Sequence, residues 1–178
     1  DFASEETKVA TPDGNNPNVI LVLLESFMDP GEVNYLSLSK DAIPTFHALE
    51  RNYSTGYLEV PVVGAGTANS EFELLTGMNM KYFGTGEYPY KTTLKNHTCE
   101  SIASSFNNLG YGTHVVHNNG GNFYSRVNAF SQMGFDTFIS KEMMDITEYN
   151  PLGTWPTDDI LIGETIKKNN IQDKAELY

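Results

Sequence analysis

The chain has 178 residues, a length typical of one domain, and carries 23 acidic but only 11 basic side chains, a formal net charge of −12. Proteins that bind nucleic acids usually carry a basic patch, so this balance argues against such a function. Apolar residues at 39% and aromatic residues at 12% exclude a disordered acidic tail, and the single Cys99 excludes a disulfide framework and a multi-cysteine zinc site.

The first third of the sequence predicts a linker, two strands and a helix. Residues 1–16 are polar and rich in turn residues, so we expect a linker or a terminal remnant there, with the folded domain over 17–178. Residues 18–24 are expected to form a strand, because the continuously aliphatic run over 19–24 is typical of a central strand of a parallel sheet and far too short to span a membrane. A helix is expected around residues 43–53 and a second strand over 57–63.

The remaining sequence alternates helices with strands. We expect helices from Thr67 to about Gly77 and over 98–109, a strand over 113–117, a helix over 124–133, a strand over 135–139 and a last helix over 157–168. This alternation predicts an α/β fold with three layers, in which helices cover both faces of a mostly parallel sheet. In such folds, ligands bind beyond the carboxyl ends of the strands.

Three candidate site residues lie at the ends of predicted strands: Glu25, Thr67 and His117. Glu25 is either an ordinary solvated strand end or an oxygen ligand for a divalent cation. Thr67 is either the N-cap of its helix or a nucleophile, because the positive end of the helix dipole and a bound cation would both favour its ionisation. A lone histidine such as His117 is more often structural than catalytic, but Arg126 follows it, and such a pair can bind a phosphate group.

Three stretches, taken in order, carry the motifs of one known family. Residues 18–27 are an apolar strand ending in Glu25, residues 66–77 place Thr67 at the start of a helix, and residues 117–126 join a histidine, an aromatic residue and an arginine. Together they resemble the extracellular catalytic domain of the lipoteichoic acid synthase family. That family is the phosphoglycerol transferase branch of the alkaline phosphatase and sulfatase superfamily.

The resemblance implies a mechanism and a set of site residues. Glu25 and Thr67 would hold a divalent cation, in this family most often Mn²⁺, with Mg²⁺ or Zn²⁺ as alternatives. Thr67 would attack the phosphorus of phosphatidylglycerol or a related phospholipid and pass the glycerophosphate to a polymer or glycan acceptor. His117, Tyr124 and Arg126 would bind the phosphate or the glycerol of the substrate.

The sequence departs from the family in two respects. Tyr124 stands where some members have tryptophan, and the sequence contains no Asp-His dipeptide, the pair with which the family completes its metal site farther along the chain. We therefore expect residues 17–178 to be the N-terminal part of a sulfatase-like catalytic domain, with an incomplete active site and no activity alone. The resemblance also implies an anchor, formed by upstream helices, at the extracellular face of a bacterial cell membrane.

Two other functions stay open. The first is a sulfatase or phosphatase of the same superfamily, although the Cys/Ser-x-Pro-x-Arg motif of common sulfatases is absent around Cys99. The second is a non-catalytic binding module.

Overall fold

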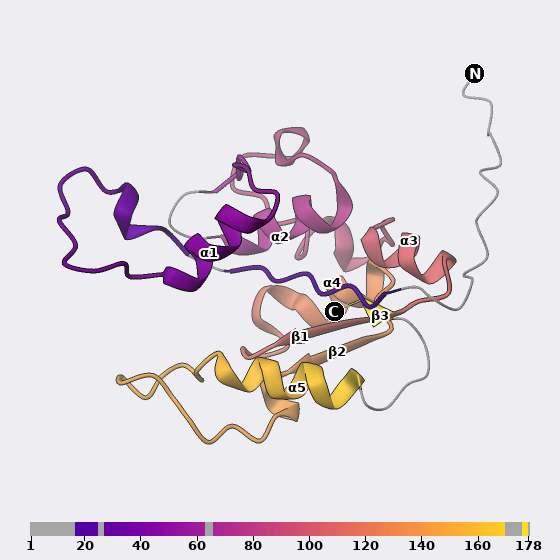
Figure 1. The fold of residues 1–178 in the computed structure, drawn as a ribbon. Helices are drawn as coiled ribbons and strands as arrows, with labels where there is room; N and C mark the ends of the chain where they lie inside the picture. Colours follow the sequence, from indigo (N-terminus) through magenta and orange to yellow (C-terminus); the bar gives the residue numbers. More distant parts are fainter. Residues whose placement is uncertain (1–16, 25–26, 63–65, 170–175, 178) are drawn as a thin grey trace.

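A short parallel sheet forms the centre of the chain (Figure 1). The computed structural model describes residues 17–24, 27–62, 66–169 and 176–177. In the sheet, β1 (Gly112–His117) lies between β2 (Thr137–Ser140) and β3 (Glu176–Leu177), and both neighbours run parallel to it. The expected parallel sheet is therefore confirmed, and β3 is a strand that the sequence did not predict.

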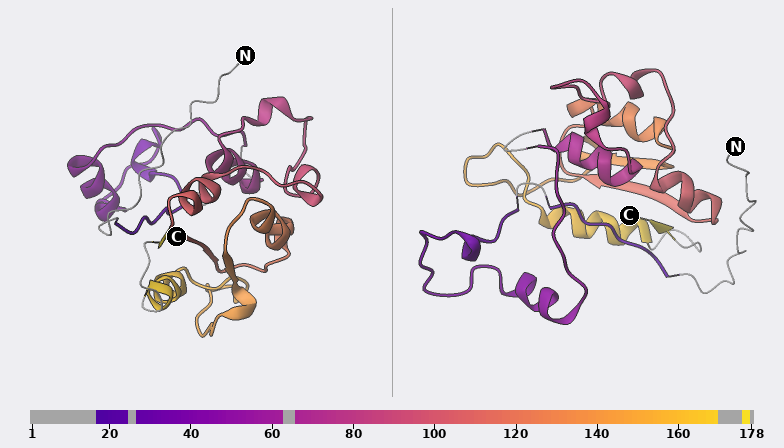
Figure 2. Two further views of the ribbon diagram at one scale, coloured as in Figure 1. Left: turned by 90° about the vertical axis from the view of Figure 1, so that its right-hand side faces the viewer. Right: turned by 90° about the horizontal axis from the view of Figure 1, so that it is seen from above.

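Helices cover both faces of this sheet. The α-helices of the described residues are α1 (Pro44–Asn52), α2 (Thr67–Thr76), α3 (Ile102–Asn108), α4 (Arg126–Gln132) and α5 (Asp159–Asn169). Short 3-10 helices are η1 (Pro30–Glu32), η2 (Met80–Tyr82), η3 (Thr93–Lys95), η4 (Phe123–Ser125) and η5 (Lys141–Met143). In Figures 1 and 2, α4 and α5 lie on opposite faces of the β1–β2 pair, which confirms the predicted α/β layering.

The hydrophobic core lies between α2, α4 and the segment that leads to η3. Phe130 on α4 is 2% exposed, and its ring centroid lies 4.9 Å from that of Phe138 on β2 and 6.0 Å from that of Tyr90. Tyr90 in turn meets Phe72 of α2 edge to face at 6.3 Å. Edge-to-face aromatic pairs of this kind add to the free energy gained from burial. This packing holds α2 and α4 together, and both helices carry predicted site residues.

The prediction of two strands in the first third of the chain is wrong, because the described residues of both segments form no strand. Residues 18–24 form no strand, only a single bridge at Val19, and each side chain from 20 to 24 is at least 38% exposed. Residues 57–62 also lack strand pairing, and Tyr57 is 99% exposed. A strand requires a neighbour to pair with, and among the described residues neither segment forms a ladder with β1, β2 or β3. Residue 63 and the linker over 1–16 lie outside the described residues.

Element boundaries differ from the sequence predictions where local hydrogen bonds decide them. The helix predicted over 98–109 is α3, which begins after Ser101, because Ser101 and Ser104 form a reciprocal capping box. The helix predicted over 124–133 is broken into η4 and α4. The strand predicted over 135–139 is β2, which begins two residues later. By contrast, α1, β1 and α5 lie close to their predicted positions.

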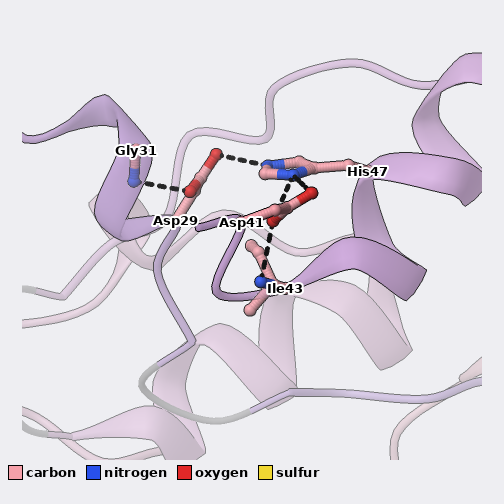
Figure 3. A network of polar contacts seen from close by, with 5 residues as sticks. All are labelled: Asp29, Gly31, Asp41, Ile43 and His47. Atoms are coloured by element: carbon pink, nitrogen blue, oxygen red, sulfur yellow. Dashed lines mark hydrogen bonds and ion pairs between the residues drawn. The ribbon is translucent and has the colours of Figure 1, made fainter. Parts of the chain in front are cut away.

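A histidine between two aspartates fastens the loop that precedes α1 (Figure 3). His47 Nε2 lies 2.8 Å from Asp29 Oδ2, and His47 Nδ1 lies 2.9 Å from the Asp41 carboxylate. Hydrogen bonds to Asp29 and Asp41 raise the pKa of His47 to about 9. The imidazolium is therefore the stable form at neutral pH, donating from both ring nitrogens.

No helix within the described ranges is both long and apolar enough to cross a membrane.

Candidate active site

The first residue of α2 is Thr67, and the backbone before it has a conformation that favours glycine. Gly66 is the N-cap of α2 with φ of 91°. A Cβ on Gly66 would lie 3.1 Å from the Tyr88 hydroxyl, so a larger residue would be both strained and crowded. Thr67 is therefore the first helical residue, and its predicted alternative as N-cap is wrong. Its half-buried side chain lies at the helix N-terminus, where the dipole is positive.

A buried ion pair connects α2 with the substrate-binding segment that the sequence predicted. Arg126, the first residue of α4, is 1% exposed. Its Nη2 donates to Glu71 Oε2 at 3.1 Å, and its Nε donates to the same carboxylate at 3.2 and 3.3 Å. Glu71 lies four residues after Thr67, so both side chains project from the same side of α2. The ion pair therefore brings Arg126 to the helix face that carries Thr67.

Tyr90 completes this network. Its hydroxyl donates to Glu71 Oε1 at 2.7 Å. Burial, followed by the charge of Glu71, raises the pKa of Tyr90 well above its ordinary value, so the hydroxyl stays protonated and remains a donor. The Glu71 carboxylate is thereby held from two sides, and the orientation of the Arg126 guanidinium is fixed in turn.

One nitrogen of this guanidinium forms no hydrogen bond with the described residues. Arg126 Nη1 is buried and has no hydrogen-bond partner among the described residues. A buried donor without an acceptor is costly, and such groups call for an explanation such as a missing ligand. The Arg126 Cζ lies 5.4 Å from the ring centroid of Tyr124, a cation–π distance. The structure therefore brings together two of the predicted substrate residues, Tyr124 and Arg126.

The backbone at Tyr124 is strained. Tyr124 and Ser125 have φ of 56° and 62°, and they are the only non-glycine residues with positive φ in the described part of the chain. Conformations of this kind persist when surrounding contacts hold them, and they concentrate at functional sites. Here the Tyr124 ring stacks on Tyr88 at 5.3 Å, and Lys91 Nζ lies 5.2 Å from the Tyr124 ring centroid. Tyr88 thus lies beside the N-cap of α2 and stacks on the substrate segment.

Of the other two predicted site residues, the structure describes His117 but not Glu25. His117 is the half-buried last residue of β1, opposite Ser140 of β2, so it does lie at the carboxyl end of a strand. Glu25 lies outside the described residues. Within the residues that the structure describes, no three His, Cys, Asp or Glu side chains lie together as a metal site. The described part of the chain does not by itself form the cation site that the resemblance implies.

Sequence reasoning assigned no role to Glu71, Tyr88, Tyr90 or Lys91. Glu71 carried a usable signal, because a carboxylate four residues after a candidate nucleophile lies on the same helix face. The other three lie in an irregular segment between α2 and η3, where no periodicity predicts which side chains face the site.

Comparison with known proteins gives a family match over nearly the whole chain. The family model described as Sulfatase matches residues 17–176. A protein of Rhizobium meliloti (strain 1021), whose name links it to cyclic β-1,2-glucan modification, is 33% identical over 152 residues. That match covers 85% of this chain but 23% of the relative.

Two solved structures share the fold. The lipoteichoic acid synthase LtaP from Listeria monocytogenes superposes with a TM-score of 0.74 and 21% identity, over 90% of this chain and 39% of that one. The phosphoglycerol transferase GacH of Streptococcus pyogenes, in complex with sn-glycerol-1-phosphate, gives 0.75 and 22%, over 92% of this chain and 43% of that one. The chain thus spans less than half the length of each of these three proteins.

Proposed function

Because this chain belongs to the sulfatase family, we propose that it is the part of a phosphoglycerol transferase that carries the nucleophile and the phosphate-binding arginine. The substrate is phosphatidylglycerol or a related phospholipid, and the acceptor is a hydroxyl of a cell-envelope polymer or glycan. The two solved neighbours support this choice, since one is named a lipoteichoic acid synthase and the other a phosphoglycerol transferase.

The observation that carries the proposal is the tie between Thr67 and Arg126 through Glu71. A phosphoryl group in front of Thr67 would accept hydrogen bonds from N–H groups at the start of α2, as anions do at helix N-termini. Arg126 Nη1, which lacks an acceptor among the described residues, supplies a cationic donor to the same group. Tyr124 would lie against the glycerol, and His117 would add a ring nitrogen to the phosphate.

The reaction proceeds in two displacements. In the first, Thr67 Oγ attacks phosphorus, its proton is lost, and the bond from phosphorus to the diacylglycerol oxygen breaks; that oxygen takes up a proton and diacylglycerol leaves. In the second, an acceptor hydroxyl attacks the glycerophospho-threonine and loses its proton, and Thr67 regains its own. Donors that face the phosphate oxygens stabilise the charge that develops in both steps.

Glu25 and Thr67 are the oxygen donors that this chain would contribute to a divalent cation, for which we propose Mn²⁺. Such a cation would supply Lewis-acid stabilisation of the phosphate. We further propose that the protein acts at the outer face of a cell membrane, where a phospholipid substrate and a cell-envelope acceptor would meet.

The experiment that tests the function is release of diacylglycerol from phosphatidylglycerol by the full-length protein, with Mn²⁺ present. Thr67→Ala should lower the rate by more than about 10³-fold, because no other group replaces an attacking hydroxyl. Ser70→Ala, one turn along the same helix, is the matched control and should keep the activity. Release that persists in Thr67→Ala would refute the nucleophile. No release by a folded, metal-loaded protein would favour a hydrolase of another phosphate or sulfate ester.

A further inference from the structure

The loop that leads from β1 to Tyr124 is held by the carboxylate of Glu142 in η5. Gly121 is buried in this loop, and its N–H donates to Glu142 Oε2 at 3.1 Å and to Oε1 at 3.3 Å. The hydroxyl of Ser140, which is 3% exposed, donates to Glu142 Oε2 at 2.6 Å. In the described chain neither donor has another acceptor, and a buried donor without an acceptor is costly.

The Glu142 carboxylate is in its charged form at neutral pH. The hydrogen bond from Ser140, followed by those from backbone N–H groups, holds the pKa of Glu142 below its ordinary value. A charged acceptor forms shorter and stronger hydrogen bonds than a neutral one. Ser140 lies opposite His117 in the sheet, so Glu142 acts at the same carboxyl edge as this predicted substrate residue.

The position of Gly121 sets the start of α4. A Cβ on Gly121 would lie 2.9 Å both from Ser140 Oγ and from Val127 Cγ2, so the loop lies closely against β2 and α4. The carbonyl oxygen of Gly121 accepts a hydrogen bond from Val127 N–H at 3.0 Å. Val127 follows Arg126 directly, so the contacts run from Glu142 through Gly121 to the backbone beside the guanidinium-bearing residue.

The two non-glycine residues with left-handed backbone lie between Gly121 and Arg126. Backbone strain of this kind persists when the surroundings hold both sides of it. Glu142 holds the side of Gly121, and Glu71 holds the side of Arg126. A carboxylate thus fixes each end of the strained segment.

We infer that Glu142 is a positioning residue for phosphate binding: through Gly121 and Val127 it holds the strained segment so that Arg126 faces the phosphate group. Glu142 itself touches neither Thr67 nor the proposed substrate. Its part in the reaction rests on the proposed function, whereas its hold on the loop does not.

Three variants of the full-length protein test the inference. Glu142→Ala leaves two buried donors without their acceptor, while the backbone bond from Lys141 N–H to Asn119 O at 3.1 Å still joins η5 to the loop. Glu142→Gln is the conservative variant, because its amide can accept from Gly121 N–H and donate to the Ser140 hydroxyl. Glu148→Ala is the matched control, since it also removes an exposed carboxylate from the segment after β2.

Hydrogen exchange and calorimetry give the first two readouts. In Glu142→Ala, amides over 118–127 should exchange about tenfold faster or more, with exchange in α2 unchanged. The affinity for sn-glycerol-1-phosphate should fall by about tenfold or more, because a displaced guanidinium no longer faces the phosphate. Glu142→Gln should restore most of both values, and Glu148→Ala should match the wild type.

The kinetics of diacylglycerol release give the third readout. Glu142→Ala should raise KM for phosphatidylglycerol with little change in kcat, whereas a mere loss of folded protein would lower kcat and leave KM unchanged. Faster exchange with unchanged glycerophosphate affinity would overturn the inference, as would a wild type that binds no glycerophosphate. Binding that depends on Glu142 in a protein that releases no diacylglycerol would support the inference and refute only the transferase.

Discussion

Replacing Glu71 with glutamine should destabilise the fold, because its carboxylate is one half of a buried ion pair. The guanidinium of Arg126 is buried to 2% exposure and Glu71 to 12%, so little water can replace the lost carboxylate charge. Removing one partner of a buried ion pair costs about 3–5 kcal/mol, and we take the lower end, about 3 kcal/mol, because the amide oxygen can still accept one hydrogen bond. For a chain of this length, that corresponds to a Tm lower by about 6–12 °C.

Urea unfolding followed by far-UV circular dichroism measures this free energy directly. Glu73→Gln is the matched control on the same helix, because its amide oxygen can still accept from the Met80 N–H, and its unfolding free energy should change by less than about 1 kcal/mol. Adding Arg126→Met to Glu71→Gln should recover part of the loss, since both buried charges are then gone. A Glu71→Gln variant within about 1 kcal/mol of the wild type would refute the claim that this pair connects α2 to α4.

Two further predictions concern the backbone before Thr67 and the charged histidine. Gly77→Ala should cost about 1–2 kcal/mol through its positive φ alone, whereas Gly66→Ala should cost more, because its Cβ also meets the Tyr88 hydroxyl; equal unfolding free energies would contradict the crowding. His47 should titrate by NMR with a midpoint of about 9, and its contribution to stability should be complete below about pH 6.5 and disappear as the pH rises through 9. A midpoint near 6.5 would mean that the two aspartates do not hold the ring in solution.

The sequence predicted those elements whose stability is mostly local. A proline at the start of α1 and a left-handed glycine after α2 are signals that single residues carry. The run over 18–24 shows the opposite case. Its composition predicts a strand, but pairing depends on a neighbouring strand, which composition does not report, and its side chains lie exposed in the described chain. The sequence also could not predict the backbone strain at Tyr124, because tyrosine and serine both occur commonly in helices.

The sequence likewise predicted part of the candidate site. Thr67 and Arg126 were candidates from their positions in the sequence and received their roles through a resemblance. The structure brings their segments together through Glu71, which helical spacing could have found. Tyr90 and Lys91 act from an irregular segment, so only the folded chain reveals them. The functional roles of all these residues remain predictions.

The left-handed pair at Tyr124 and Ser125 has a mechanical consequence. Strain of this kind amounts to about 1–3 kcal/mol per residue, and the contacts of the Tyr124 ring with Tyr88 and the cations beside it must offset it. The stack of Tyr124 on Tyr88 therefore helps to hold this strained segment in place. Because Arg126 follows directly as the first residue of α4, the contacts that hold Tyr124 also help to set where the Arg126 side chain starts.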